Sequence, residues 1–351
     1  MGPPMGPADT HENDPAPGAE PGVVYAGLDE AGYGPMLGPL CVALSVFRVR
    51  DWTPGEPAPD LWKALKSAVC RAGKDSRGKR IAIDDSKRLK GAGTETDPFG
   101  VSRLERAVLI VLGLCGHDCA TDDSVLAALG ASTERQAWGR TTPRPAPVAN
   151  DPGRLRIDSN LFSAALHSAG VTPLALRAEA VGVEDFNAQC DRLGSKGAVN
   201  FQAAARHMRF VWERWGREGA QAGGPRLVCD RHGGRTCYAG VLGRAFEEAR
   251  VEVLEETDRA SRYLLTDEQS GRAMTVLFRP EAEQAHLPVA LASMTAKYVR
   301  ELSMIRFNDH WCARAPGLAP TAGYVTDARR WLRDAAEFIT PEERRALVRL
   351  R

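Results

Sequence analysis

Short apolar runs alternate with longer segments of helical spacing along most of the chain. Residues 23–28 and 40–49 have the pattern of two buried strands, and Gly32, Gly34 and Pro35 between them predict a hairpin-like start. Because strands interleave with helices while the opening pair is antiparallel, we expect an α/β fold with a mixed central sheet flanked by helices. Further strands are predicted at 81–83, 174–183, 226–229, 251–255 and 274–278, and helices at 60–71, 101–115, 201–215, 237–250 and 289–312, followed by two short helices.

The ends of the chain and two internal stretches depart from this pattern. Residues 1–22 contain six prolines and four glycines, and their charged side chains are all acidic, so we expect a disordered acidic tail. One α/β domain is expected at 23–324, with insertions at about 50–80 and 118–156, and a helical C-terminal extension at 325–351. Four prolines within 140–153 predict a loop there.

Composition excludes several classes of protein. The 351 residues are 43% hydrophobic and 26% charged, which is typical of globular chains, and the net charge of +1 excludes a strongly basic, histone-like protein. The eight cysteines form no CxxC pair and no secretory signal pattern precedes them, so we expect reduced thiols and a cytoplasmic location. The longest apolar run, 107–115, is too short to span a bilayer, so no membrane association is expected.

Acidic residues follow several of the predicted strands. Asp29-Glu30 ends the first strand, Asp84-Asp85 ends a short one, Asp230 ends another, and Glu301 falls on the long helix. Catalytic groups in α/β sheets gather beyond the carboxyl ends of strands, and clustered carboxylates repel one another unless a divalent cation neutralises them. Oxygen ligands of this kind suit Mg²⁺ or Mn²⁺, and such a site supports two-metal hydrolysis of a phosphodiester.

Each acid taken alone also has an ordinary structural explanation. Asp84-Asp85 suits a helix N-cap, and Glu301 is spaced to pair with Lys297 four residues earlier. Asp29 and Glu30 are harder to explain in this way, because two carboxylates after a buried strand lose solvation unless something binds them. Neighbouring strand residues point to opposite faces, so we expect these two to converge through a bend at Ala31-Gly32.

Five blocks of the sequence resemble ribonuclease HII, the type 2 ribonucleases H, in the order that the family has them. They span the chain from residue 23 to about 330, and the resemblance implies an RNase H-like fold. It also implies metal-dependent cleavage of RNA paired with DNA, or of ribonucleotides embedded in duplex DNA, leaving a 3′-OH and a 5′-phosphate. The blocks are DEAGYGPMLGP at 29–39, DSKRL at 85–89, NFQA at 200–203, ASMTAKYVRE at 292–301 and GY at 323–324 with Thr326.

The resemblance assigns roles to individual positions. Asp29, Glu30 and Asp230 resemble three of the family's four metal-binding carboxylates, and Glu301 occupies the place of the fourth, normally an aspartate. The other positions resemble substrate contacts: Gly32 and Gly34 in a loop that approaches the ribose, Ser86 and Lys87 near the phosphate, and Tyr324 beside the ribonucleotide, where it helps to detect the 2′-OH. Lys297 is expected to steady the acids by charge pairing.

Two positions depart from the family pattern. Tyr33 replaces the basic residue usual between the two glycines, which removes one phosphate-binding cation, and Glu301 extends its carboxylate by one methylene. We expect a monomeric hydrolase that binds RNA/DNA hybrid or ribonucleotide-containing duplex. Two alternatives stay open: a hybrid- or duplex-binding protein that has lost turnover, and an RNase H-superfamily nuclease with altered substrate choice.

Overall fold

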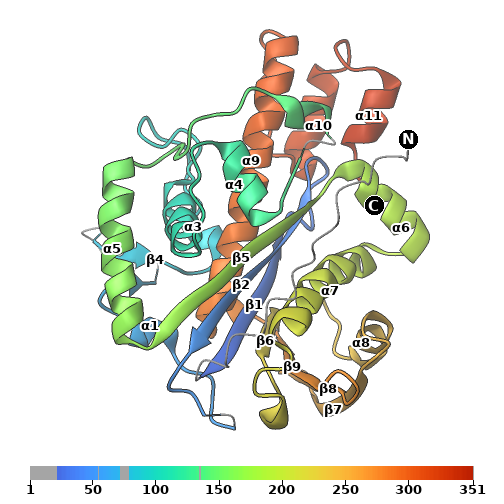
Figure 1. Ribbon diagram of the computed structural model, residues 1–351. Helices are drawn as coiled ribbons and strands as arrows, with labels where there is room; N and C mark the ends of the chain where they lie inside the picture. Colours follow the sequence, from blue (N-terminus) through green and yellow to red (C-terminus); the bar gives the residue numbers. More distant parts are fainter. Residues whose placement is uncertain (1–21, 54, 72–78, 134–135, 351) are drawn as a thin grey trace, which may run out of the picture.

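A seven-stranded mixed sheet forms the centre of the computed structural model, which describes residues 22–53, 55–71, 79–133 and 136–350 (Figure 1). The expected tail at 1–22 lies outside the described residues except for Gly22. The predicted class, α/β with a mixed central sheet flanked by helices, is confirmed. In spatial order the strands are β5 (Val171–Val181), β2 (Leu40–Val49), β1 (Val23–Ala31), β6 (Arg226–Asp230), β9 (Arg272–Arg279), β8 (Ser261–Asp267) and β7 (Arg250–Glu256).

Strand direction divides the sheet into three parts. The predicted opening hairpin is present, because β1 pairs antiparallel with β2, and β2 pairs antiparallel with β5. In the middle, β1, β6 and β9 run parallel, so their carboxyl ends lie at the same end of the sheet. The outer strands form a hairpin in which β8 pairs antiparallel with β9 and β7 pairs antiparallel with β8.

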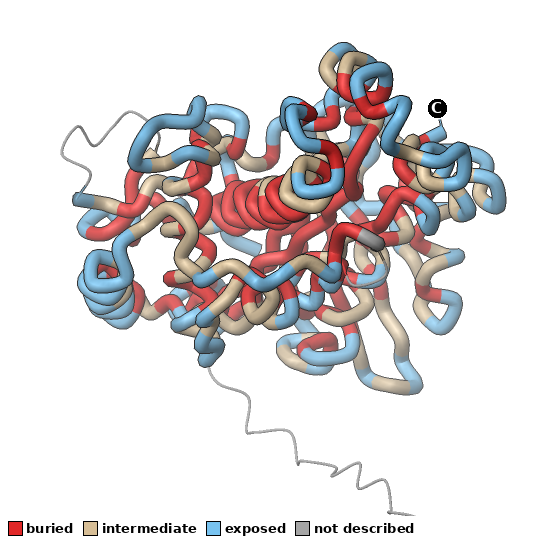
Figure 2. Tube along the Cα trace, turned by 90° about the horizontal axis from the view of Figure 1, so that it is seen from above, coloured by how far each residue is buried: buried red, intermediate tan, exposed pale blue. Residues whose placement is uncertain are grey.

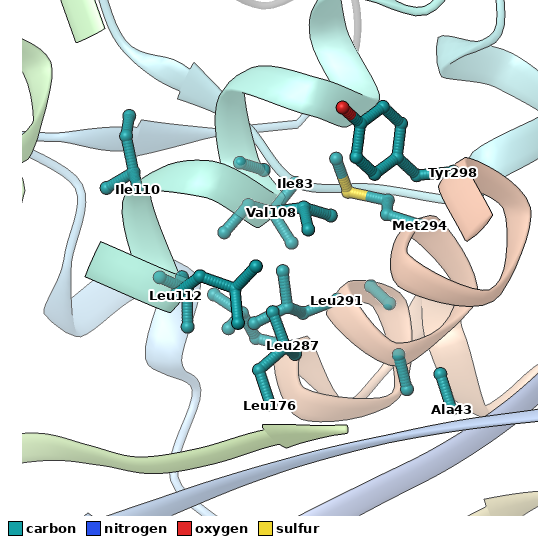
Figure 3. Packing of buried hydrophobic residues seen from close by; sticks show 14 of the residues in the cluster. Ala43, Ile83, Val108, Ile110, Leu112, Leu176, Leu287, Leu291, Met294 and Tyr298 are labelled. Atoms are coloured by element: carbon teal, nitrogen blue, oxygen red, sulfur yellow. The ribbon is translucent and has the colours of Figure 1, made fainter. Parts of the chain in front are cut away.

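Helices cover the two faces of the sheet. On one face the long helix α9 (Leu287–Arg314) packs on β1 and β2, and α3 (Ser102–Leu114) packs against α9. Figure 3 shows this contact, in which Leu287, Leu291, Met294 and Tyr298 recur at helical spacing along α9. On the other face lie α7 (Lys196–Trp215) and α8 (Ala239–Ala245). Buried residues therefore run through the middle of the molecule, with exposed residues at its rim (Figure 2).

The C-terminal helices pack on the second half of α9 (Figure 1). These are α10 (Val325–Asp334) and α11 (Pro341–Leu347), as the pattern predicts. Trp331 of α10 lies against Phe307 and Trp311 of α9 in a buried aromatic cluster. No helix in the described ranges is long and apolar enough to cross a membrane.

Several elements differ from the prediction. The helix expected at 60–71 is only α1 (Leu61–Ala64), because Val69–Cys70 forms strand β3, paired with β4 (Ile81–Ala82). The helix expected at 237–250 is confined to α8, since Arg250 already belongs to β7. The expected loop ends at Asp151, which caps α5. The pattern did not reveal α4 (Asp122–Leu129), α5 (Pro152–Ser168), α6 (Val183–Leu193), β8, or the 3-10 turns Ala137–Arg140, Ala220–Ala222 and Ala282–Gln284.

Candidate active site

Three of the predicted acids lie at the carboxyl ends of the parallel strands β1 and β6. Asp29 and Glu30 close β1, and Asp230 is the last residue of β6. The bend expected at Ala31-Gly32 is not needed, because regular pairing with β2 continues through Ala31 and Cys41. Asp29 and Glu30 therefore approach the end of the sheet from opposite faces.

Asp29 lies on the face covered by α9, where it is only partly exposed to solvent. Burial, followed by the negative charges of Glu30 and Asp230, raises its pKa well above the ordinary range. The hydroxyl of Ser293 and the backbone N–H of Glu30, which donates to Asp29 Oδ1 at 2.7 Å, offset only part of this. Metal-free Asp29 is thus held in an environment that disfavours its carboxylate.

Glu30 lies on the opposite face, between α7 and the loop after β6. Burial raises its pKa to about 7, and the charge of Asp230 adds to the rise. The buried amide of Asn200 lowers the pKa in part, although neither of its polar atoms forms a hydrogen bond of normal geometry. Glu30 Oε2 is likewise buried without a hydrogen-bond partner, and it lies 3.9 Å from His232 Nε2.

The sequence analysis assigned no role to His232, which lies on the same face of the sheet as Glu30. Its ring packs edge-on against Phe201, Tyr238 and Phe278, and burial lowers its pKa to about 4. Near neutral pH it is therefore uncharged and does not compensate the charge of Glu30. His232 therefore supplies no positive charge beside Glu30.

Asp230 shares the α9 face of the sheet with Asp29. Burial raises its pKa, while the backbone N–H of Ala282, which donates to Asp230 Oδ1 at 3.1 Å, and the cation of Lys87 lower it in part. The same Lys87 lowers the pKa of Glu30. Lys87 is therefore the cation whose field reaches two of the three acids, as a residue near a substrate phosphate would be.

The helix face that was expected to point at the acids is only partly directed at them. Ser293 contacts Asp29 and shares a hydrogen bond of 3.0 Å with the hydroxyl of Ser86, which begins α2 (Ser86–Leu89). Glu301 follows Ser293 by eight residues, about 12 Å along the helix. Its carboxylate forms an ion pair with Lys297 and lies 3.7 Å from Lys90 Nζ.

Gly32 and Gly34 belong to a loop whose backbone forms hydrogen bonds with the buried side chain of Arg300. Gly32 has φ of 82°, and a Cβ there would lie 2.7 Å from the carbonyl oxygen of Pro39. Arg300 Nη1 and Nη2 donate to the carbonyl oxygens of Pro39 and Leu37 at 3.0 and 3.2 Å. The loop backbone is therefore fixed in shape.

Two tyrosines stand at the rim of the site. Tyr324 is 49% exposed, and its ring centre lies 5.8 Å from both Lys297 Nζ and Arg300 Cζ. Tyr33 is 42% exposed and lines a cavity of about 680 Å³ beside the N-terminus of α7. The negative charge of Glu30 contributes to a raised pKa of the Tyr33 hydroxyl, after burial. Both rings are accessible to a substrate that covers the acids.

The donor chemistry of Asp29, Glu30 and Asp230 fits a hard divalent cation. All three are carboxylates whose pKa is raised by burial, the charge of Asp230 raises the pKa of the other two further, and one buried oxygen of Glu30 has no partner. Among the described residues, however, no three His, Cys, Asp or Glu side chains already form a group that could hold a metal ion. Lysines lie close to both oxygens of Glu301.

On the sequence, Asp84-Asp85 could belong to the group of acids at strand ends or form a helix cap, and the structure distinguishes the two residues. Asp85 caps α2 by accepting from the N–H of Lys87 at 2.9 Å, whereas Asp84 is buried. Sequence reasoning did not identify Asn200 and Lys90 as neighbours of the acids. Asn200 could have been found, since it opens one of the five family-like blocks.

Comparisons with known proteins return solved structures only. No protein-family model and no curated protein matches the chain. RNase HII in the PCNA:RNase HII complex from Archaeoglobus fulgidus is 14% identical, with a TM-score of 0.38 over 94% of this chain and 95% of that one. Ribonuclease H2 from Pyrococcus horikoshii OT3 is 14% identical, with a TM-score of 0.39 over 93% and 92%.

A third solved structure, Bst-RNase HIII in complex with Mn²⁺, is also 14% identical, with a TM-score of 0.36 over 94% of this chain and 67% of that one. Because all of these TM-scores lie below 0.5, we draw no functional argument from them.

Proposed function

We propose that this protein is a metal-dependent endonuclease that cleaves the RNA strand of RNA/DNA hybrids, or ribonucleotides embedded in duplex DNA. One observation carries the proposal: Asp29, Glu30 and Asp230 lie at the carboxyl ends of parallel strands, where burial raises the pKa of all three and the charge of Asp230 raises those of Asp29 and Glu30 further. Such an arrangement is unfavourable in a metal-free protein and becomes favourable once a divalent cation is bound. The five family-like blocks supply the substrate class.

In this proposal Asp29, Glu30 and Asp230 would hold Mg²⁺ or Mn²⁺. The ions would supply activation of the attacking water and stabilisation of the leaving oxygen. Lys87 attracts the phosphate next to the acids, and the rigid loop at Gly32 lets backbone approach the ribose. The exposed ring of Tyr324 stacks beside the ribonucleotide and responds to the 2′-OH.

The test is cleavage of a duplex that contains one ribonucleotide, and of a continuous RNA/DNA hybrid, with Mg²⁺, Mn²⁺ or EDTA. We expect products with 3′-OH and 5′-phosphate ends, none in EDTA, and loss of cleavage in Asp29→Asn without loss of the fold. Asp118→Asn, which removes an exposed carboxylate far along the chain, is the matched control. Cleavage by Asp29→Asn at the wild-type rate would show that Asp29 is not a ligand.

A second candidate, a hybrid- or duplex-binding protein without turnover, is favoured by one observation. Lysines neutralise Glu301, and no metal-ready group of three ligands exists among the described side chains. The same assay separates the two functions. Tight duplex binding that is independent of metal, with no products at any metal concentration, would establish the binding protein in place of the nuclease.

A further inference from the structure

A cavity of about 750 Å³ lies on the α9 face of the sheet, apart from the acids. Its floor includes Tyr25, Val228 and Leu277, which come from the parallel strands β1, β6 and β9. Tyr25 precedes Asp29 by four residues on the same strand, about 13 Å further from the end of the sheet. None of the candidate site residues lines this cavity. Its volume is within the range of small-molecule binding sites.

The walls of the cavity are mainly apolar and include an aromatic side. The hairpin β7–β8 contributes Leu254 and Leu264, and the segment after β2 contributes Trp52. Trp52 packs edge-on against Tyr25, with ring centres 5.1 Å apart. Leu254 remains 47% exposed, which is unusual for a leucine beside a deep hollow unless something covers it.

Three arginines line the same cavity. Arg226 is occupied, because it donates to Thr275 Oγ1 and to the carbonyl oxygens of Gly223 and Gly224, and Arg262 lies 3.8 Å from Glu255. The guanidinium of Arg279 forms no hydrogen bond or ion pair with the residues that the structure describes, although its backbone carbonyl accepts from the N–H of Arg231 at 3.0 Å. Its positive charge acts on Tyr25 and on His286, so it is directed at that end of the cavity.

His286 supplies an unused polar atom beside Arg279. It is buried, its Nδ1 lies 2.5 Å from the hydroxyl of Tyr25, and its Nε2 has no partner. Burial lowers its pKa to about 4, so the ring is neutral near pH 7. When the Tyr25 hydroxyl donates to Nδ1, the ring proton lies on Nε2, which then can donate to an acceptor. A buried donor without a partner is costly unless a ligand satisfies it.

We propose that this cavity binds a mononucleotide, with its base against Trp52 and the apolar floor and its phosphate at Arg279 and His286. A planar base suits aromatic and aliphatic walls, and a phosphate matches a cation beside a neutral donor. Arg226 and Arg262 already have partners, so Arg279 is the arginine of the cavity whose charge is available to a phosphate. Glu56, also at the cavity, offers an acceptor for ribose hydroxyls. The proposal does not rest on the nuclease function.

The test is a titration followed by tryptophan fluorescence, because Trp52 lines the cavity. The probes are the four ribonucleoside 5′-monophosphates, inorganic phosphate, adenosine and octanoate. We expect saturable quenching with at least one monophosphate at tenfold lower concentration than with phosphate, adenosine or octanoate. Octanoate that binds as well as the nucleotides, or phosphate alone that does so, would overturn the proposal, as would no saturable signal with any monophosphate.

Variants locate the binding. Arg279→Gln should raise the Kd at least tenfold, Arg279→Lys should stay within a few-fold of wild type, and Trp52→Phe should remove the signal. Arg259→Gln, an exposed arginine of the same hairpin that does not line the cavity, is the matched control and should bind normally. Far-UV circular dichroism checks that each variant is folded.

Equal Kd values for wild type and Arg279→Gln would place the nucleotide elsewhere and refute the site. Normal nucleotide binding by Asp29→Asn would show that the two sites are independent.

Discussion

Arg349 Nε donates to the carbonyl oxygen of Gly38 at 2.9 Å, so the last turn of the described chain holds the loop that begins beside the acids. The same guanidinium donates to the carbonyl oxygen of Gly32 and lies over the ring of Phe186. Arg349 is buried, and burial lowers its pKa to about 9. It still carries its charge at pH 7, where it positions the loop from the side opposite Arg300.

Replacing Arg349 should loosen this loop. Arg349→Met removes two charge-assisted hydrogen bonds, and we expect the free energy of unfolding to fall by about 2–4 kcal/mol. If the loop contacts substrate, KM should rise more than kcat falls. Arg345→Met, an exposed arginine paired only with Glu342, is the control and should change neither. Denaturant unfolding and steady-state cleavage measure the two effects, and an unchanged KM in a folded Arg349→Met would exclude a positioning role.

Glu30 should make the metal-free protein less stable as pH rises. Its pKa is raised to about 7 from 4.5, so the folded protein binds this proton more tightly than the unfolded chain does. Stability is therefore lost between about pH 4.5 and 7. Glu30→Gln removes that loss and should stabilise the protein by about 3 kcal/mol at pH 8 in EDTA. Near pH 4.5 the gain should vanish, and a gain that does not depend on pH would contradict the assignment.

The sequence predicted the parts of the fold whose pattern is local. The runs that form β1 and β2 are apolar at nearly every position because both faces of these strands are covered, and α9 is long and apolar for the same reason. The helix α5 was missed because Ile157 and Leu161 remain exposed, so its apolar positions do not mark one buried face. The strand β8 buries only Tyr263 and Leu265 among its apolar residues and is defined by its pairing with β7 and β9.

The candidate site divides in the same way. Asp29, Glu30 and Asp230 could be predicted because each follows a recognisable strand, and strand ends meet at one end of a parallel sheet. The contact of Arg349 with Gly38 joins residues more than 300 positions apart, and no local pattern marks it. The neutral state of His232 could not be predicted from the sequence either, because it follows from burial among Phe201, Tyr238 and Phe278.

Glu301 tests whether the longer fourth carboxylate takes part in metal binding. Lys297 and Lys90 now hold its oxygens, so a metal must compete with both. If the surroundings have adjusted to glutamate, Glu301→Asp will draw the carboxylate back and weaken Mg²⁺ binding about tenfold by calorimetry. If they have not adjusted, the same change will raise cleavage activity. We expect adjustment, since both oxygens already have close partners.

Two further variants complete the Glu301 test. Glu301→Ala at the wild-type rate, with unchanged metal dependence, would show that Glu301 is an ordinary helix residue paired with Lys297. Glu337→Asp, an exposed glutamate near the C-terminal helices, controls for the loss of a methylene and should leave metal binding unchanged.

Tyr33 tests whether the glycine loop faces the nucleic acid. Its ring is exposed beside a cavity and within reach of the charge of Glu30, where a basic side chain would meet a phosphate. Tyr33→Arg should increase duplex affinity and steepen the dependence of log K on log salt by about 0.9, the value for one added phosphate contact. Tyr33→Phe keeps the ring without the hydroxyl and should leave the slope unchanged. Fluorescence anisotropy between 50 and 300 mM salt, in Ca²⁺ or EDTA to prevent cleavage, gives both slopes. Equal slopes for Tyr33→Arg and wild type would mean that residue 33 points away from the phosphates.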